Sequence, residues 1–151
     1  MHAFRTLRSF LIVMMLAIAV AMPMMAQPAA AAEPGTIAIH SRICDADAVQ
    51  LFRDCHGNPG PAGATYKVGN RTPKTIGTSG NVSFGAVAAG DRLVTLTSGL
   101  PAAYDSIRAF CSNSVGGSGV HEATILYSAT PQFWVRLAAG SRLTCDVYFI
   151  P

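Results

Sequence analysis

The feature that most constrains the fold is a series of short runs in which apolar and polar residues alternate. In TIAIHSRI, residues 36–43, Ile37, Ile39 and Ile43 share one face. Similar runs occupy residues 64–68, 82–87, 92–98, 104–112, 121–128, 132–138 and 142–150. Period-two runs bounded by Gly, Pro, Asn or Ser are typical of strands joined by turns. The sequence therefore predicts an all-β fold, an antiparallel β-sandwich or barrel.

The phase of these runs predicts which side chains point into the core. In the run 82–87, Val82, Phe84 and Ala86 fall on one face. The other inward sets are Ala64, Tyr66 and Val68; Ile107, Ala109 and Cys111; and Leu143, Cys145, Val147 and Phe149. Alternation of this kind is expected when one face of a sheet is buried.

One short helical excursion is expected after the first strand, in DADAVQLF, residues 45–52. Asp45 is interpreted as its N-cap, a position where Asp is favoured. Asp45 and Asp47 are also spaced like the start of a calcium-binding loop. That loop requires an oxygen ligand and then Gly, where this chain has Val49 and Gln50. We therefore expect no metal there.

The N-terminal segment has the pattern of a secretory signal peptide. Arg5 and Arg8 precede an apolar run at residues 10–22, and Ala30 and Ala32 form an A-x-A cleavage site. Ala26 offers a second site, and the alternative is an uncleaved anchor, although the run is shorter than the roughly 20 residues of a membrane span. We expect a signal peptide at residues 1–32 and one domain at 33–151.

The charge of the expected mature domain is close to neutral. Removing two of the 11 basic residues leaves 9, against 8 acidic residues, a net charge of +1. It contains no run of Lys or Arg, so a nucleic-acid partner is not expected. Contact with a membrane would come only through an uncleaved signal segment.

All four cysteines lie in the expected mature domain. An even number of cysteines in a secreted chain predicts disulfides. The strand phases favour Cys44–Cys55 with Cys111–Cys145, a pairing that requires the chain to double back after Phe52. Two other pairings remain open. A c-type haem would need another Cys where Phe52 stands.

Other chemistry has weaker signals. A zinc site built from His40, Cys44, Cys55 and His56 matches no common ligand spacing. His40, His56 and His121 are interpreted as solvated side chains, and no G-x-S-x-G motif occurs. We expect neither an enzyme nor a cofactor.

Trp134 and Tyr148 are the candidate ligand contacts. Trp134 alternates with Phe133 and Val135, so one of the two ring positions should face outward. An exposed Trp134 beside Tyr148 would make a stacking platform for a sugar or a peptide. The alternative, favoured here, is that Trp134 packs on the edge of the core.

Residues 78–104 resemble the prealbumin-like repeats of bacterial surface proteins, of the Cna-B or SpaA type. In those repeats a turn Gly leads to a strand Phe, a turn ending in Gly, and a strand running to Pro and Tyr. Gly80, Phe84, Gly90, Pro101 and Tyr104 occupy these positions here. The resemblance covers most of residues 35–151 and implies a prealbumin- or transthyretin-like sandwich.

The chain departs from the resemblance at the internal Lys–Asn isopeptide bond that many of these repeats carry. The first strand has no Lys, Phe149 stands at the Asn position, and Thr97 stands at the position of the assisting acid. The only lysines, Lys67 and Lys74, lie elsewhere. We therefore expect disulfides in place of this cross-link.

The function expected from these observations is that of a secreted, non-enzymatic structural or adhesive module of the bacterial cell surface. The alternative is a soluble extracellular domain that binds or inhibits a ligand through its loops or an exposed aromatic patch. In either case the partner would be an extracellular protein or a glycan.

Overall fold

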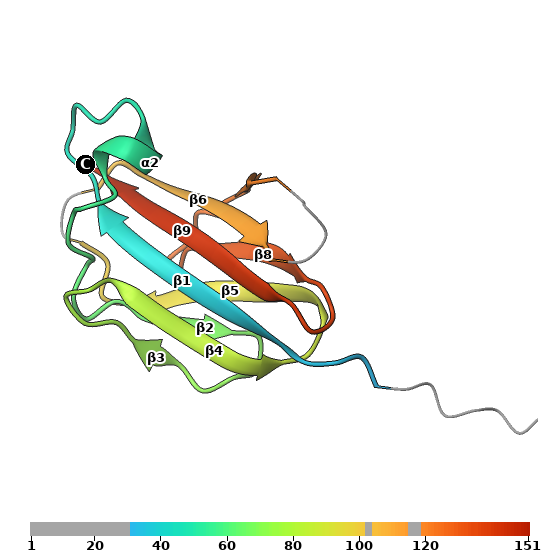
Figure 1. Ribbon diagram of the computed structural model, residues 1–151. Coiled ribbons are helices and arrows are strands. Elements are labelled where there is room, and N and C mark those ends of the chain that lie inside the picture. The colour runs from blue at the N-terminus through green and yellow to red at the C-terminus, as the bar shows by residue number, and fades with distance from the viewer. Residues whose placement is uncertain (1–30, 102–103, 115–118) are drawn as a thin grey trace, which may run out of the picture. The chain divides into compact units, whose positions relative to one another are not determined.

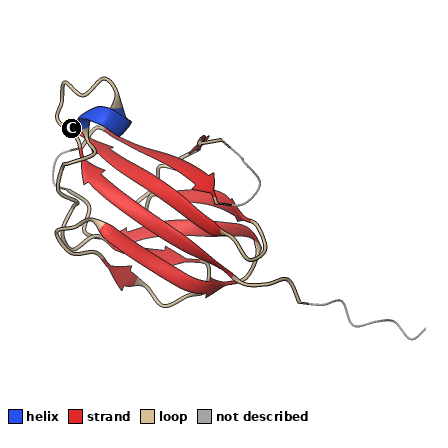
Figure 2. Ribbon diagram, in the orientation of Figure 1, coloured by secondary structure: helices blue, strands red, loops and turns tan. Residues whose placement is uncertain are grey.

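The computed structural model describes residues 31–101, 104–114 and 119–151, and the regular secondary structure of these residues is almost entirely strand (Figure 1). Within these described ranges, one short helix, α2, follows the first strand (Figure 2). The elements are β1 (Gly35–Ile43), α2 (Leu51–Asp54), β2 (Thr65–Val68), β3 (Lys74–Thr75), β4 (Asn81–Val87), β5 (Gly90–Ser98), β6 (Ser106–Asn113), β7 (His121–Ala123), β8 (Gln132–Leu137) and β9 (Arg142–Ile150). The predicted all-β class is confirmed.

Two sheets form the sandwich. One has five strands in the order β4-β1-β9-β6-β7, and the other has four in the order β3-β2-β5-β8. The larger sheet is mixed, because the first and last strands, β1 and β9, pair in parallel from Thr36↔Arg142 to Ile43↔Phe149. The expectation of a purely antiparallel sandwich was therefore wrong for this pair of strands. Parallel neighbours cannot be joined by a short turn, and β1 and β9 are separated by most of the domain.

The core lies between the sheets and follows the predicted phases in most strands. The inward side chains of β2, β6 and β9 are buried as expected, including Tyr66, Ile107 and Val147. The central strand β1 is covered on both faces at its start, since Ala38 is buried on one face and Ile37 and Ile39 are buried on the other. Ser41 lies on the same inward face as the isoleucines. The Ser41 and Tyr66 hydroxyls share a buried hydrogen bond of 2.7 Å.

Strand β4 departs from the predicted phase. Phe84 and Val87 are buried, whereas Ala86 is exposed and adopts a positive φ of 51°. The register with β1 shifts at the same place, from Phe84↔Ile37 to Val87↔Gly35. A bulge of this kind reverses the facing of the residues after it, so the expected inward position of Ala86 was wrong.

The run 121–128 forms a strand only at His121–Ala123. Beyond it, Leu126 makes an isolated bridge to Gln132. The hydroxyl of Tyr127 accepts a hydrogen bond from the N–H of Ile107 (3.0 Å) and donates one to its carbonyl (2.8 Å). These contacts hold the segment as a loop against the sandwich. The prediction of a strand over residues 121–128 was therefore wrong beyond Ala123.

Both predicted disulfides form, Cys44–Cys55 and Cys111–Cys145. The helix between the first pair is shorter than predicted and begins at Leu51. Asp45 is therefore not its N-cap. Instead, the Asp54 carboxylate accepts hydrogen bonds from the N–H groups of Val49 (3.1 Å) and Gln50 (2.8 Å). These bonds fold the chain back, so that the Cα atoms of Cys44 and Cys55 lie 5.1 Å apart.

Candidate ligand-binding face

Trp134 lies on the outer face of the four-stranded sheet. Strand β8 alternates strictly, with Phe133, Val135 and Leu137 buried in the core and Trp134 and Arg136 pointing outward. Trp134 has 58% of its surface exposed. The preferred expectation, that this indole packs on the edge of the core, was therefore wrong.

The neighbours of Trp134 on strand β5 are mostly polar. Leu93 lies directly opposite Trp134, with Asp91 opposite Arg136 and Thr95 opposite Gln132. Side chains directly opposite one another on a sheet are close enough to interact. The indole is therefore surrounded on its sheet by an acid, a guanidinium and an amide that can hydrogen bond to a ligand stacked on the ring.

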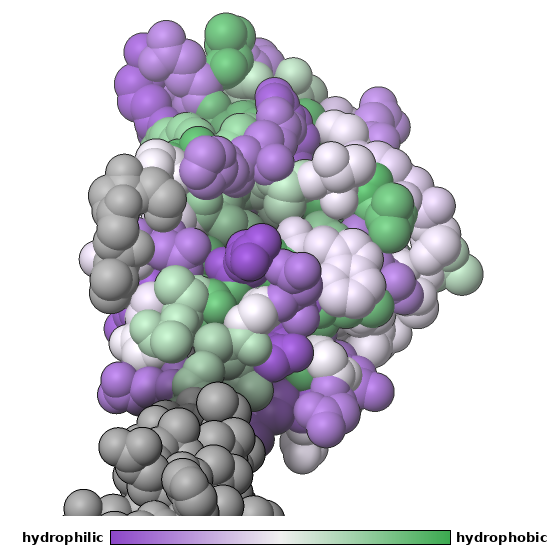
Figure 3. Space-filling model, turned by 90° about the vertical axis from the view of Figure 1, so that its right-hand side faces the viewer, coloured by the Kyte–Doolittle hydropathy of each residue, from purple (hydrophilic) through white to green (hydrophobic). Residues whose placement is uncertain are grey.

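A cleft of about 250 Å³ lies beside Trp134, between β8 and the β6–β7 pair. Its polar lining comes from Asn113, His121, Glu122 and Arg136. The Asn113 amide donates a hydrogen bond to the Arg136 carbonyl (3.3 Å), which joins the two sheets at this edge. Figure 3, which views the molecule from the right-hand side of Figure 1, shows polar and apolar residues interspersed in small areas.

Tyr148 lies on β9 in the other sheet and does not join this face. It is 4% exposed and belongs to a small apolar cluster with Cys44, Leu51 and Cys55. The ring of Phe52 approaches it edge-on at 5.7 Å. Burial, with the nearby carboxylate of Asp146 as a second cause, raises the pKa of Tyr148 to about 12. The expected platform of Trp134 with Tyr148 is therefore not formed.

The position of Tyr148 follows from the Cys44–Cys55 excursion, which covers part of the outer face of the five-stranded sheet (Figure 1). The sequence contains a signal for this cover. Residues 147–150, VYFI, are continuously apolar, and such a run indicates a strand buried on both faces. Alternation alone would have placed Tyr148 on a solvated face.

The three histidines in the described strands and loops do not form a recognisable catalytic group. Nδ1 of His40 lies 3.3 Å from the Asp146 carboxylate on the outer face of the five-stranded sheet. Its neighbour Ser41 points the other way, into the core. Among the described residues, no group of three or more His, Cys, Asp or Glu side chains could hold a metal ion. The zinc alternative is contradicted, because Cys44 and Cys55 are joined to each other.

The fold and its cross-links define a two-sheet β-sandwich with two buried disulfides. Comparison with family models, curated proteins and solved structures finds no match to this chain. Disulfides are typical of oxidising compartments such as the extracellular space. No helix in the described part of the chain has the length and apolar character needed to span a membrane.

Proposed function

We propose that this protein is a secreted, non-enzymatic adhesive module that binds an extracellular ligand on the Trp134 face of its four-stranded sheet. The observation that carries the proposal is the exposure of Trp134 beside a polar cleft. A large exposed indole on a soluble domain is unusual, since burying it would remove a large apolar surface from water.

The chemistry of the face favours a glycan or a polar peptide. Trp134 supplies a flat ring on which a sugar ring or a peptide side chain can stack. Gln132, Asp91 and Arg136 supply donors and acceptors around it. A purely apolar ligand would leave these polar groups without partners, at a cost in binding free energy.

Two further observations support an extracellular role and a prealbumin-like fold of the Cna-B or SpaA type. The basic and apolar N-terminal pattern and the two disulfides fit a secreted chain. Gly80 and Gly90, which the resemblance assigns to turns, have positive φ angles of 71° and 106°. Both angles lie in the region that glycine adopts with little strain.

The test is a glycan and matrix-protein binding array probed with the wild-type protein and with Trp134→Ala. A Trp anchor in a binding site typically contributes about 2 kcal/mol, so the variant should bind about 30-fold more weakly. The matched control is Val49→Ala, which removes an 85%-exposed apolar side chain from the excursion and should bind normally. Because the chain has one Trp, its fluorescence reports binding directly.

Equal binding by wild type and Trp134→Ala would refute the face as the binding site. Binding of no array component would leave only the structural role and contradict adhesion. Secretion has its own measurement, N-terminal sequencing of the exported protein, which should begin at Glu33 or at Gln27. Recovery of only the full-length chain in a membrane fraction would favour an anchor.

A further inference from the structure

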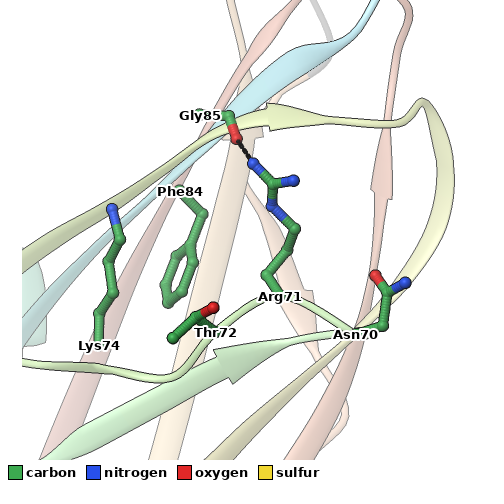
Figure 4. Close-up of a pocket in the computed structure, with 6 residues that line it drawn as sticks. All are labelled: Asn70, Arg71, Thr72, Lys74, Phe84 and Gly85. Carbon is green, nitrogen blue, oxygen red and sulfur yellow. Dashed lines mark hydrogen bonds between the residues drawn. The ribbon is translucent and has the colours of Figure 1, made fainter.

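A second cleft lies at the opposite edge of the sandwich, between the segment after β2 and strand β4 (Figure 4). Its volume is about 400 Å³, and it is lined by Asn70, Arg71, Thr72, Lys74, Phe84 and Gly85. An adjoining hollow of about 430 Å³ shares Asn70 and Arg71 and adds Arg92. Three cationic side chains, Arg71, Lys74 and Arg92, therefore line these two hollows.

The cations of this cleft are held in place by backbone carbonyls. The Arg71 guanidinium donates a hydrogen bond to the Gly85 carbonyl (2.6 Å), as Figure 4 shows. The Lys74 ammonium donates to the Ser83 carbonyl (2.6 Å) and lies 5.4 Å from the centre of the Phe84 ring. Because β3 and β4 are edge strands, these bonds satisfy carbonyls that face away from the sheets.

Most of the donor capacity of Arg71 and Lys74 remains available for a ligand, whereas the Arg92 guanidinium already donates to three backbone carbonyls. A guanidinium has five N–H donors and an ammonium has three. Within the described residues, the side chains of Arg71 and Lys74 each make one hydrogen bond. None of the three ion pairs found in that part of the chain includes Arg71, Lys74 or Arg92.

The charge around the cleft is strongly unbalanced. The residues that line the two hollows include three cations, Arg71, Lys74 and Arg92, and no acidic side chain. Residues 33–151 as a whole carry 9 − 8 = +1. Three cations therefore border these hollows without an acid beside them, and a concave surface increases their attraction for an anion.

We infer that this cleft binds an oxyanion, a phosphate or sulfate group. The guanidinium of Arg71 matches two oxygens of such a group, and Lys74 adds a point charge. A single-stranded nucleic acid would need exposed aromatic rings for stacking, but the one ring that lines these hollows, Phe84, is only 2% exposed. A membrane surface would need apolar anchors, and the large exposed apolar residues of the described chain line neither hollow.

The test is a binding titration followed by NMR amide shifts, at constant ionic strength. The probes are sodium phosphate, sodium sulfate, a phosphorylated maltose, a sulfated maltose and unmodified maltose. The double variant Arg71→Gln/Lys74→Gln removes both charges while keeping polar side chains. Lys67→Gln is the matched control, because it removes one cation from strand β2 that does not line the cleft. Arg71→Lys/Lys74→Arg keeps the charge and guards against a loss caused by misfolding.

The charged saccharides should shift the amides of residues 69–74 and 83–87, and unmodified maltose should not. Affinity should fall about tenfold or more in Arg71→Gln/Lys74→Gln, stay within about twofold in Lys67→Gln, and be largely kept in the charge-preserving variant. A higher affinity for the phosphorylated or for the sulfated maltose identifies which of the two oxyanions the cleft prefers.

Three results would overturn the inference. They are no saturable shift with any anionic probe at millimolar concentration, an equal loss of affinity in Lys67→Gln, or unchanged affinity in Arg71→Gln/Lys74→Gln. Trp134→Ala should leave this titration unchanged. The cleft and the proposed adhesive face can therefore fail independently.

Discussion

Removing the Cys44–Cys55 disulfide should release the excursion without unfolding the sandwich. The perturbation is the double variant Cys44→Ala/Cys55→Ala, since alanine leaves no polar group in these buried positions. Both cysteines belong to a small apolar cluster with Leu51 and Tyr148, separate from the main core. The sandwich core therefore loses no contact of its own.

The expected magnitude follows from the size of the closed loop. A cross-link spanning 11 residues contributes about 3 kcal/mol in the chain-entropy model. Burial of Leu51, the one buried residue of α2, contributes about 2 kcal/mol. The disulfide thus supplies a large share of what orders the excursion, and without it the segment should open locally.

Tyr148 and Arg53 provide two assays for this opening. The pKa of Tyr148, raised to about 12 under the excursion, should fall toward 10 when the cover is lost, measured by NMR from the ring carbon that bears the hydroxyl. Trypsin should cut after Arg53 in the variant sooner than in the wild type.

The matched comparison is Cys111→Ala/Cys145→Ala, which removes the cross-link inside the main core. Its 34-residue loop corresponds to about 4 kcal/mol, and the loss should appear as a lower midpoint of global unfolding in urea. An unchanged pKa of Tyr148 together with unchanged cleavage at Arg53 would refute the argument that the disulfide holds the excursion on the sheet.

Two further predictions concern alkaline stability and covalent structure. Burial raises the pKa of the Tyr66 phenol above its ordinary value of 10.0, so its stabilising contribution is complete below about pH 10 and is lost as pH rises further. Above about pH 10, this group should lower the free energy of unfolding by about 1.4 kcal/mol per pH unit. In Tyr66→Phe, the slope of unfolding free energy against pH should be smaller by the contribution of one proton. The variant should also lose about 1 to 3 kcal/mol of stability, because the Ser41 hydroxyl loses its partner. The intact mass of the reduced protein should show no loss of water or ammonia, because Lys67 and Asp146 lie on different sheets; a loss mapped to this pair would restore the isopeptide cross-link.

The strands of this fold could be predicted because their two faces differ in polarity. The alternation in β2 and β6 and the inward set of β9 gave buried side chains correctly, and the phases of Cys111 and Cys145 favoured their pairing. The same rule failed at Ala86, because a bulge changes the phase without changing the composition of the strand. It also missed the parallel pairing of β1 with β9, which depends on contacts between the two ends of the chain.

At the candidate site, as in the fold, features set by neighbouring residues could be predicted from the sequence, and features set by distant segments could not. The outward direction of Trp134 is local, because it follows from the buried neighbours Phe133 and Val135 on one strand. The apolar run 147–150 indicates that Tyr148 is buried, but it does not show which segment covers it. That segment precedes Tyr148 by about a hundred residues and is held there by Cys44–Cys55. Two aromatic residues that look equivalent in the sequence therefore serve different purposes. Tyr148 packs under the excursion, and Trp134 remains exposed on the outer face of its sheet.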